Sequence, residues 1–97
     1  MRATRTTLKK LEAIFQDLDY TIRYEKGNFN SGYCIVEERR IVVINRFFDT
    51  EGRVNSLLDI LSQIVVHLEL LSESSLDFYN KILKSGFTIS NKSATAV

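Results

Sequence analysis

The feature that most constrains this chain is a short run that is apolar on both faces of a predicted strand. Residues 41–44 read Ile-Val-Val-Ile, and β-branched side chains favour a strand. Successive side chains of a strand point to opposite faces, so both faces of this run need cover. The chain must supply that cover from its own elements, or it leaves an apolar surface for another chain.

A second strand is predicted earlier in the chain by strict alternation. Within residues 20–26 the side chains of Tyr20, Ile22 and Tyr24 alternate with polar ones, which is typical of a strand with one buried face. Residues 27–32 read Gly-Asn-Phe-Asn-Ser-Gly, and this concentration of glycine and asparagine predicts a turn.

Residues 33–38 predict a strand between that turn and a third strand over residues 41–45. The link at residues 38–40 is too short for anything but a hairpin. We therefore expect a three-stranded antiparallel meander in which the strand 41–45 lies at an edge.

Helical spacing predicts three helices around these strands. The first covers residues 5–18, with Thr6 or Thr7 as its N-cap. The second covers residues 50–71, with Asp49 as its N-cap. The third follows the serine-rich segment 72–75. The apolar stripe of each is, in turn, Leu8, Leu11, Ile14, Phe15 and Leu18; Val54, Leu57, Leu58, Leu61, Ile64, Val65, Leu68 and Leu71; and Leu76, Tyr79, Ile82 and Leu83.

The third helix is expected to end at Gly86, with Phe87 contacting its last turn. The predicted fold is thus a single α+β domain over residues 1–90. It has an N-terminal helix, a three-stranded antiparallel meander and two C-terminal helices packed on the sheet. Residues 91–97 are expected to form a flexible polar tail.

Length and composition narrow the function classes. The 97 residues suffice for one domain, and no apolar run approaches the roughly 20 residues that span a membrane. The net charge of +1 creates no general field for nucleic acid or anionic lipid. One cysteine excludes an intramolecular disulfide, and no secretory segment precedes the domain, so we expect a cytoplasmic protein.

The residues most able to do chemistry are Cys34 and His67, each the only one of its type. A catalytic cysteine–histidine pair would need a third group to orient the histidine. Cys34 also lies in an apolar run, where a thiol is usually buried. Zinc needs three or four converging ligands, and the chain has one histidine and one cysteine. The loop 27–32 lacks the lysine and the following helix of a phosphate-binding loop. We predict no catalytic, metal or cofactor-binding residue, no cofactor and no small-molecule substrate.

Two apolar features suggest a partner. Ile41 and Val43 would be exposed if their strand lies at an edge, and apolar edges pair with other chains. Val66 and Leu70 would form an outward pair on the long helix. We therefore expect a non-enzymatic protein that acts through protein contacts, as a homodimer or with another protein. The alternative is a monomer in which the third helix or the tail covers the edge.

Positive charge is concentrated at the start of the chain. Arg2, Arg5, Lys9 and Lys10 give the first ten residues a charge of +4, which leaves −3 for the remainder. These side chains are candidates for contact with an anion, either nucleic acid or an acidic partner. Nucleic-acid binding is the weaker alternative, because no recognised binding motif accompanies them.

The middle of the chain resembles a group of short bacterial proteins of unknown function. The resemblance rests on the pattern K-G-x-F-x-S-G-x-C over residues 26–34, followed by a hairpin and I-V-x-x-N over residues 41–45. It implies a family identity and carries no activity.

The order of elements is also similar to the zincin-like domain of ImmA/IrrE-type metallopeptidases, in which a helix and a hairpin precede an active-site helix bearing H-E-x-x-H. Placing Arg53 on the arginine near the start of that helix puts Leu58, Asp59 and Ser62 at the H-E-x-x-H positions. Leu58 and Ser62 cannot replace zinc-binding histidines. The resemblance therefore implies a catalytically inactive remnant.

Overall fold

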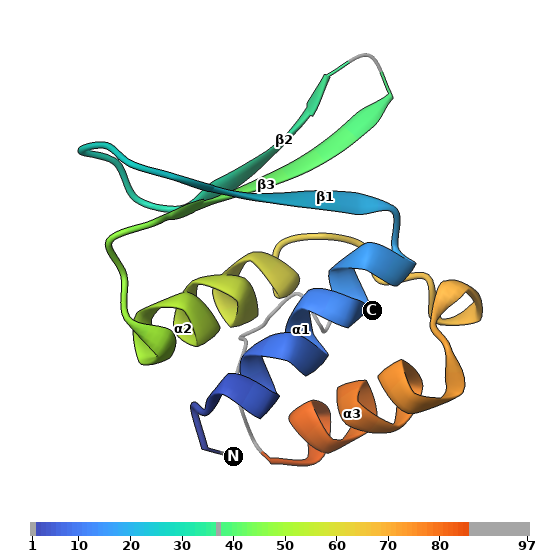
Figure 1. The fold of residues 1–97 in the computed structure, drawn as a ribbon. Coiled ribbons are helices and arrows are strands. Elements are labelled where there is room, and N and C mark those ends of the chain that lie inside the picture. The colour runs from blue at the N-terminus through green and yellow to red at the C-terminus, as the bar shows by residue number, and fades with distance from the viewer. Residues whose placement is uncertain (1, 37, 86–97) are drawn as a thin grey trace.

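The computed structural model describes residues 2–36 and 38–85 and shows an α+β fold (Figure 1). Its elements follow one another as α1 (Arg5–Asp17), β1 (Tyr20–Glu25), β2 (Gly32–Val36), β3 (Arg39–Asn45), α2 (Thr50–Leu61), the 3-10 helix η1 (Leu68–Leu70) and α3 (Glu73–Lys84). The predicted Gly86 cap, its Phe87 contact and the tail 91–97 lie outside the described residues.

The first helix forms where its apolar spacing predicts. Its N-cap, however, is Thr4 rather than Thr6 or Thr7, because the Thr4 hydroxyl accepts a hydrogen bond from the Thr7 backbone N–H at 3.2 Å. The Thr7 hydroxyl instead donates to the Arg2 carbonyl at 2.6 Å. Asp49 caps α2 as predicted, with Oδ1 accepting from the Gly52 N–H at 2.8 Å.

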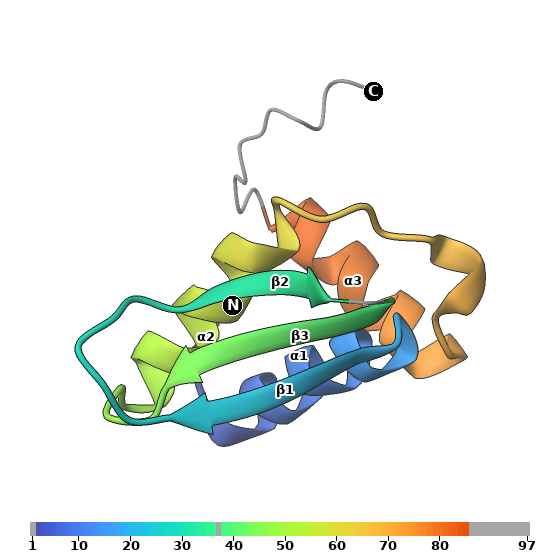
Figure 2. The same cartoon turned by 90° about the horizontal axis from the view of Figure 1, so that it is seen from above.

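The antiparallel meander is wrong, because the sheet is mixed and its strand order is β1-β3-β2. β3 pairs with β1 in parallel and with β2 in antiparallel fashion. It is therefore the central strand and not an edge. The connection 26–31 carries the chain past the end of β3, so that β2 pairs on the far side of β3 from β1 (Figure 2).

Hydrogen bonds of Asn45 tie this connection to β3. The Asn45 side-chain amide donates to the carbonyl oxygens of Gly27 and Phe29 at 3.0 and 2.8 Å. The Asn45 backbone N–H donates to the Ser31 hydroxyl at 3.2 Å. The glycine-rich segment and the asparagine of the sequence pattern thus form one hydrogen-bonded unit.

The helices cover one face of the sheet in two layers (Figure 1). α1 and α2 lie against the sheet. The prediction that α3 also packs on the sheet is wrong, because α3 packs on α1. The fully buried core between them includes Leu11, Ile14, Phe15, Val42, Ile44 and Leu57. On α3 the buried apolar side chains are Phe78 and Ile82, whereas Leu83 is exposed, contrary to its predicted place in the stripe.

The long helix predicted over residues 50–71 ends ten residues early, at Leu61. The Ser62 hydroxyl donates to the Asp59 carbonyl at 2.6 Å, which competes with the next helical turn. Beyond it, residues 62–63 form a turn, and the residues that follow as far as His67 form an extended segment in which half-buried and exposed side chains alternate. Val65 consequently points outward, while Ile64 and Val66 pack against the core.

Candidate interaction surface

β2 is an edge strand, and its side chains are apolar and exposed. It pairs only with β3 within the described residues, which leaves its other edge without a backbone partner. None of the residues 32–36 carries a charge, and Ile35 and Val36 are 59% and 49% exposed. Natural edge strands usually carry lysine, proline or a bulge that discourages pairing. An uncharged apolar edge is therefore suited to pairing with a further strand.

A groove of about 340 Å³ lies beside this edge. One wall is formed by Tyr33 and Ile35 of β2, and the other by the extended segment and η1, with Val65 and Leu70. Figure 2 shows the segment running from the end of α2 to η1 along the β2 side of the sheet. Val65 is 73% exposed and Leu70 is 50% exposed. We call the free edge of β2 together with this groove the β2 surface.

The apolar part of the β2 surface has a charged and polar rim. Arg40 and His67 line the groove, and each has one acidic neighbour. Arg40 lies 3.9 Å from the Asp19 carboxylate, and His67 Nδ1 lies 3.6 Å from the Glu69 carboxylate. Such exposed pairs contribute little to stability. The two pairs lie at the rim, so the centre of the groove is mainly apolar.

Tyr20 forms part of the groove floor, where it meets the core. Its ring packs edge-on against Phe15, with ring centroids 5.9 Å apart. Burial raises the pKa of the Tyr20 hydroxyl above its usual value, and the positive charge of Arg40 opposes this rise. The hydroxyl is thus neutral near pH 7, and the floor presents no anion to a ligand.

Of the four predicted interface residues, the structure places only Leu70 in the groove. Ile41 and Val43 lie on the outer face of the central strand, half-buried between its two neighbours. Val66 is half-buried against the core and forms no helical pair with Leu70. The predicted edge and the predicted helix face therefore do not exist in this form.

Tyr33, Ile35 and Val65 were not predicted as interface residues. A signal was present, because residues 33–36 read Tyr-Cys-Ile-Val and are apolar on both faces like residues 41–44. Which of these two runs lies at an edge depends on strand order. Local sequence carries no such information.

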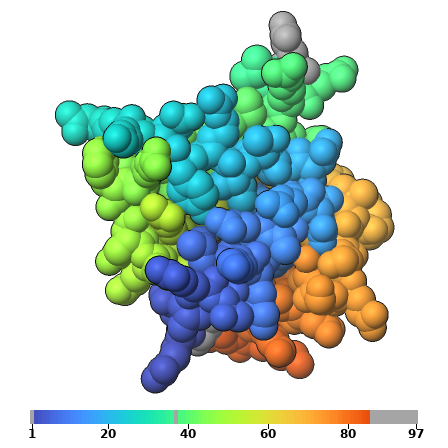
Figure 3. Space-filling view, in the orientation of Figure 1, coloured from blue at the N-terminus to red at the C-terminus, as the bar shows by residue number. Residues whose placement is uncertain are grey.

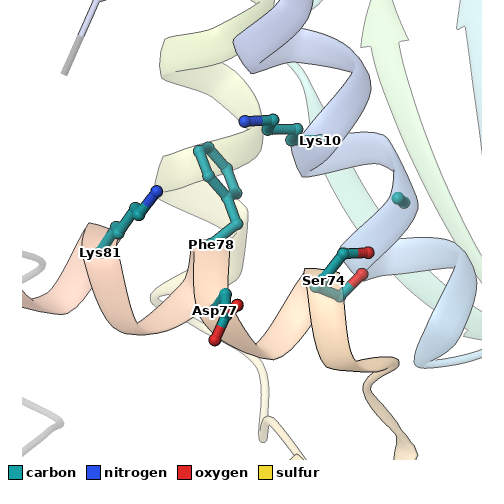
Figure 4. Close-up of a pocket in the computed structure, with 7 residues that line it drawn as sticks. Lys10, Ser74, Asp77, Phe78 and Lys81 are labelled. Carbon is teal, nitrogen blue, oxygen red and sulfur yellow. The ribbon is translucent and has the colours of Figure 1, made fainter.

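The basic side chains of the first ten residues do not form one cluster. Arg5 and Lys9 line a cavity together with Arg53 of α2. Lys10 lies on another face of α1, with its ammonium 5.4 Å from the centre of the Phe78 ring (Figure 4). That second pocket, of about 270 Å³, also contains Ser74, Asp77 and Lys81 of α3. Arg2 is exposed and lines neither.

The two reactive side chains do not lie together. Cys34 is exposed, contrary to the burial expected from its apolar neighbours. It lies on the opposite face of β2 from Tyr33 and Ile35, because adjacent strand residues alternate. His67 lines the groove on the Tyr33 and Ile35 side. The fold thus separates the thiol from the imidazole.

The positions compared with H-E-x-x-H do not form a metal centre. Leu58 is 3% exposed and belongs to the core. The Asp59 carboxylate accepts a hydrogen bond from the Gln63 side chain at 3.1 Å. The Asp59 backbone carbonyl accepts another from the Ser62 hydroxyl. Across residues 2–36 and 38–85 no three His, Cys, Asp or Glu side chains gather as metal ligands would.

Comparison of the chain with protein-family models, with curated proteins and with solved structures finds no match. Among the helices of the described residues, none has the length and apolar character needed to cross a bilayer.

Proposed function

We propose that this protein is a non-enzymatic interaction module that forms a homodimer through the β2 surface. The observation that carries the proposal is the free β2 edge, which is uncharged, apolar on both faces and adjacent to an apolar groove. Edge strands of this kind bind by adding a strand, in which main-chain hydrogen bonds give affinity and side-chain pockets give specificity.

A second copy of the chain is the occupant that fits this edge best. Two identical strands pair antiparallel about a two-fold axis, and such an interface is closed because neither copy keeps a free β2 edge. Full overlap of residues 32–36 places Cys34 opposite its own copy and Tyr33 opposite the Ile35 of the second copy. Since the strand carries no charge, this pairing brings no like charges together.

The groove would be filled by the same pairing. Tyr33 and Ile35 point to the groove side of β2, so the equivalent side chains of an added strand would face Val65 and Leu70. Each copy would cover the exposed apolar side chains of the other. The dimer would contain one continuous six-stranded sheet.

Sedimentation equilibrium of the whole chain tests this proposal. The wild-type chain is expected to sediment as a dimer at micromolar concentration, and Ile35→Lys as a monomer, because the lysine would place a charge on the shared edge. Leu83→Lys is the matched control, because Leu83 is similarly exposed (54% against 59%) but lies on α3. A wild-type chain that stays monomeric well above micromolar concentration would overturn the proposal.

We further place the protein in the cytoplasm. Its one thiol, Cys34, is exposed, and a reducing compartment keeps such a thiol free. The proposed dimer would then be held by backbone pairing and apolar contacts rather than by a disulfide.

A further inference from the structure

A cavity lies where α1 and α2 begin, and it shares no lining residue with the groove beside β2. Its volume is about 520 Å³, and its lining includes Arg5 and Lys9 from α1 and Phe48, Thr50 and Arg53 around the start of α2. Figure 3 shows the start of α1 (blue) beside the start of α2 (green) on this side of the molecule. Three cationic side chains thus face one space.

Arg53 is held in this cavity by two hydrogen bonds to backbone carbonyls. Its Nε donates to the Phe48 carbonyl and its Nη2 to the Arg46 carbonyl, both at 3.0 Å. The guanidinium also lies 4.6 Å from the centre of the Tyr24 ring. A guanidinium has five N–H donors, so three remain for a ligand. A fixed group with free donors binds an oxyanion at little entropic cost.

Two carboxylates, those of Glu12 and Asp49, line the same cavity, so its lining carries three positive and two negative charges. Glu12 accepts a short hydrogen bond from the Tyr24 hydroxyl, and Asp49 Oδ1 accepts from the Gly52 N–H. In the part of the chain that the structure describes, none of Arg5, Lys9 and Arg53 forms an ion pair. The cavity lining therefore keeps a net charge of +1, and its three cations are not paired with the two carboxylates.

We propose that this cavity binds a phosphate monoester. Arg53 would make a bidentate contact with two phosphate oxygens, and Arg5 and Lys9 would contact the third. The ester is close to doubly charged at neutral pH, so it matches several cations better than a carboxylate does. Leu8 and Phe48 line the same cavity and would pack against the organic part of the ester. This inference is independent of the proposed dimer.

Titration by two-dimensional NMR at constant ionic strength tests the site, with inorganic phosphate as the first probe. Saturable shifts are expected at the Arg53 Nε resonance and at the amides of residues 50–53. Arg5→Gln with Lys9→Gln should weaken binding at least tenfold, because two of the three cations are lost. Among the described residues neither side chain forms a hydrogen bond or an ion pair, so the double variant should remain folded.

Lys10→Gln is the control for the charge lost at Lys9, because it removes one positive charge at the next residue of α1, whose side chain faces Phe78. It should leave phosphate binding within twofold of wild type. An absence of saturable shifts, or an equal loss in the Lys10 variant, would overturn the site.

A phosphoserine peptide and adenosine 5′-monophosphate then distinguish the two sources of a phosphate ester. Tighter binding of the peptide than of inorganic phosphate would identify a phosphorylated protein as the ligand. Tighter binding of the nucleotide would identify a small metabolite. If neither ester binds more tightly than phosphate, the contact proposed with Leu8 and Phe48 is wrong.

Discussion

The side-chain nitrogen of Asn45 lies 2.8 Å from the carbonyl oxygen of Phe29, which joins the end of the central strand to the connection between the two outer strands. The same nitrogen donates to Gly27. Because the connection crosses from one side of β3 to the other, its closure determines which strand becomes the free edge. The proposed interaction surface therefore depends on a contact between two residues, Asn45 and Phe29, that are 16 positions apart in the sequence.

Asn45→Ala should destabilise the fold, because two carbonyl oxygens lose their donor while Asn45 itself is 7% exposed. We expect the free energy of unfolding to fall by about 1–3 kcal/mol, and the melting temperature by roughly 4–8 °C for each kcal/mol. Urea denaturation measures the first and calorimetry the second. Asn30→Ala is the control, because Asn30 is exposed in the same connection. An equal effect of the two variants would contradict the role of Asn45.

The Tyr24 hydroxyl should make stability fall at high pH. Burial raises the pKa of Tyr24, and its hydrogen bond to Glu12 raises it further. Above about pH 10 the unfolded chain loses this proton while the folded chain keeps it, so the stabilisation present below pH 10 is progressively lost. Denaturation from pH 8 to 11 should show a shallower decline for Tyr24→Phe than for wild type. Identical slopes would show that Tyr24 titrates normally.

Asp17 should contribute to stability with the opposite dependence on pH. Its carboxylate accepts from the Ser72 backbone N–H at 2.9 Å, joining the end of α1 to the N-cap of α3. This bond lowers the pKa of Asp17. The stabilisation is therefore present above pH 4 and is lost as the pH falls through the lowered value. Asp17→Asn should unfold less steeply with acid than wild type, whereas Asp77→Asn, exposed on α3, should behave like wild type.

Local pattern predicted the elements that depend on local physics. The first helix follows from apolar spacing, and the second begins at Asp49 because a carboxylate there can cap the first turn. The end of the second helix was not predictable in this way. Ile64 fits both the apolar stripe of a helix and the alternation of a strand, whereas Val66 lies off that stripe and fits only the alternation. The Ser62 hydrogen bond lies where the helix ends, before either residue.

Strand order was the larger error, and it moved the candidate surface. A six-residue connection after β1 can close a hairpin or cross to the far side of β3. The choice rests on the long-range hydrogen bonds of Asn45. Leu70 was predicted as half of an outward helical pair with Val66, and it lines the groove although the helix ends before both residues. Tyr33 and Ile35 could not be assigned to the interface without knowing that β2 is an edge.

The central claim, pairing of two β2 strands about Cys34, is tested most directly by mild oxidation of the whole chain in dilute solution. In that register the two Cys34 Cα atoms would lie about 4.5–5.5 Å apart, within the range that a disulfide spans. The wild-type chain should give a covalent dimer. Cys34→Ser with Val36→Cys should not, because two residues at position 36 would lie about 14 Å apart along the strands. Cross-linking of the two proteins to the same extent would contradict the account.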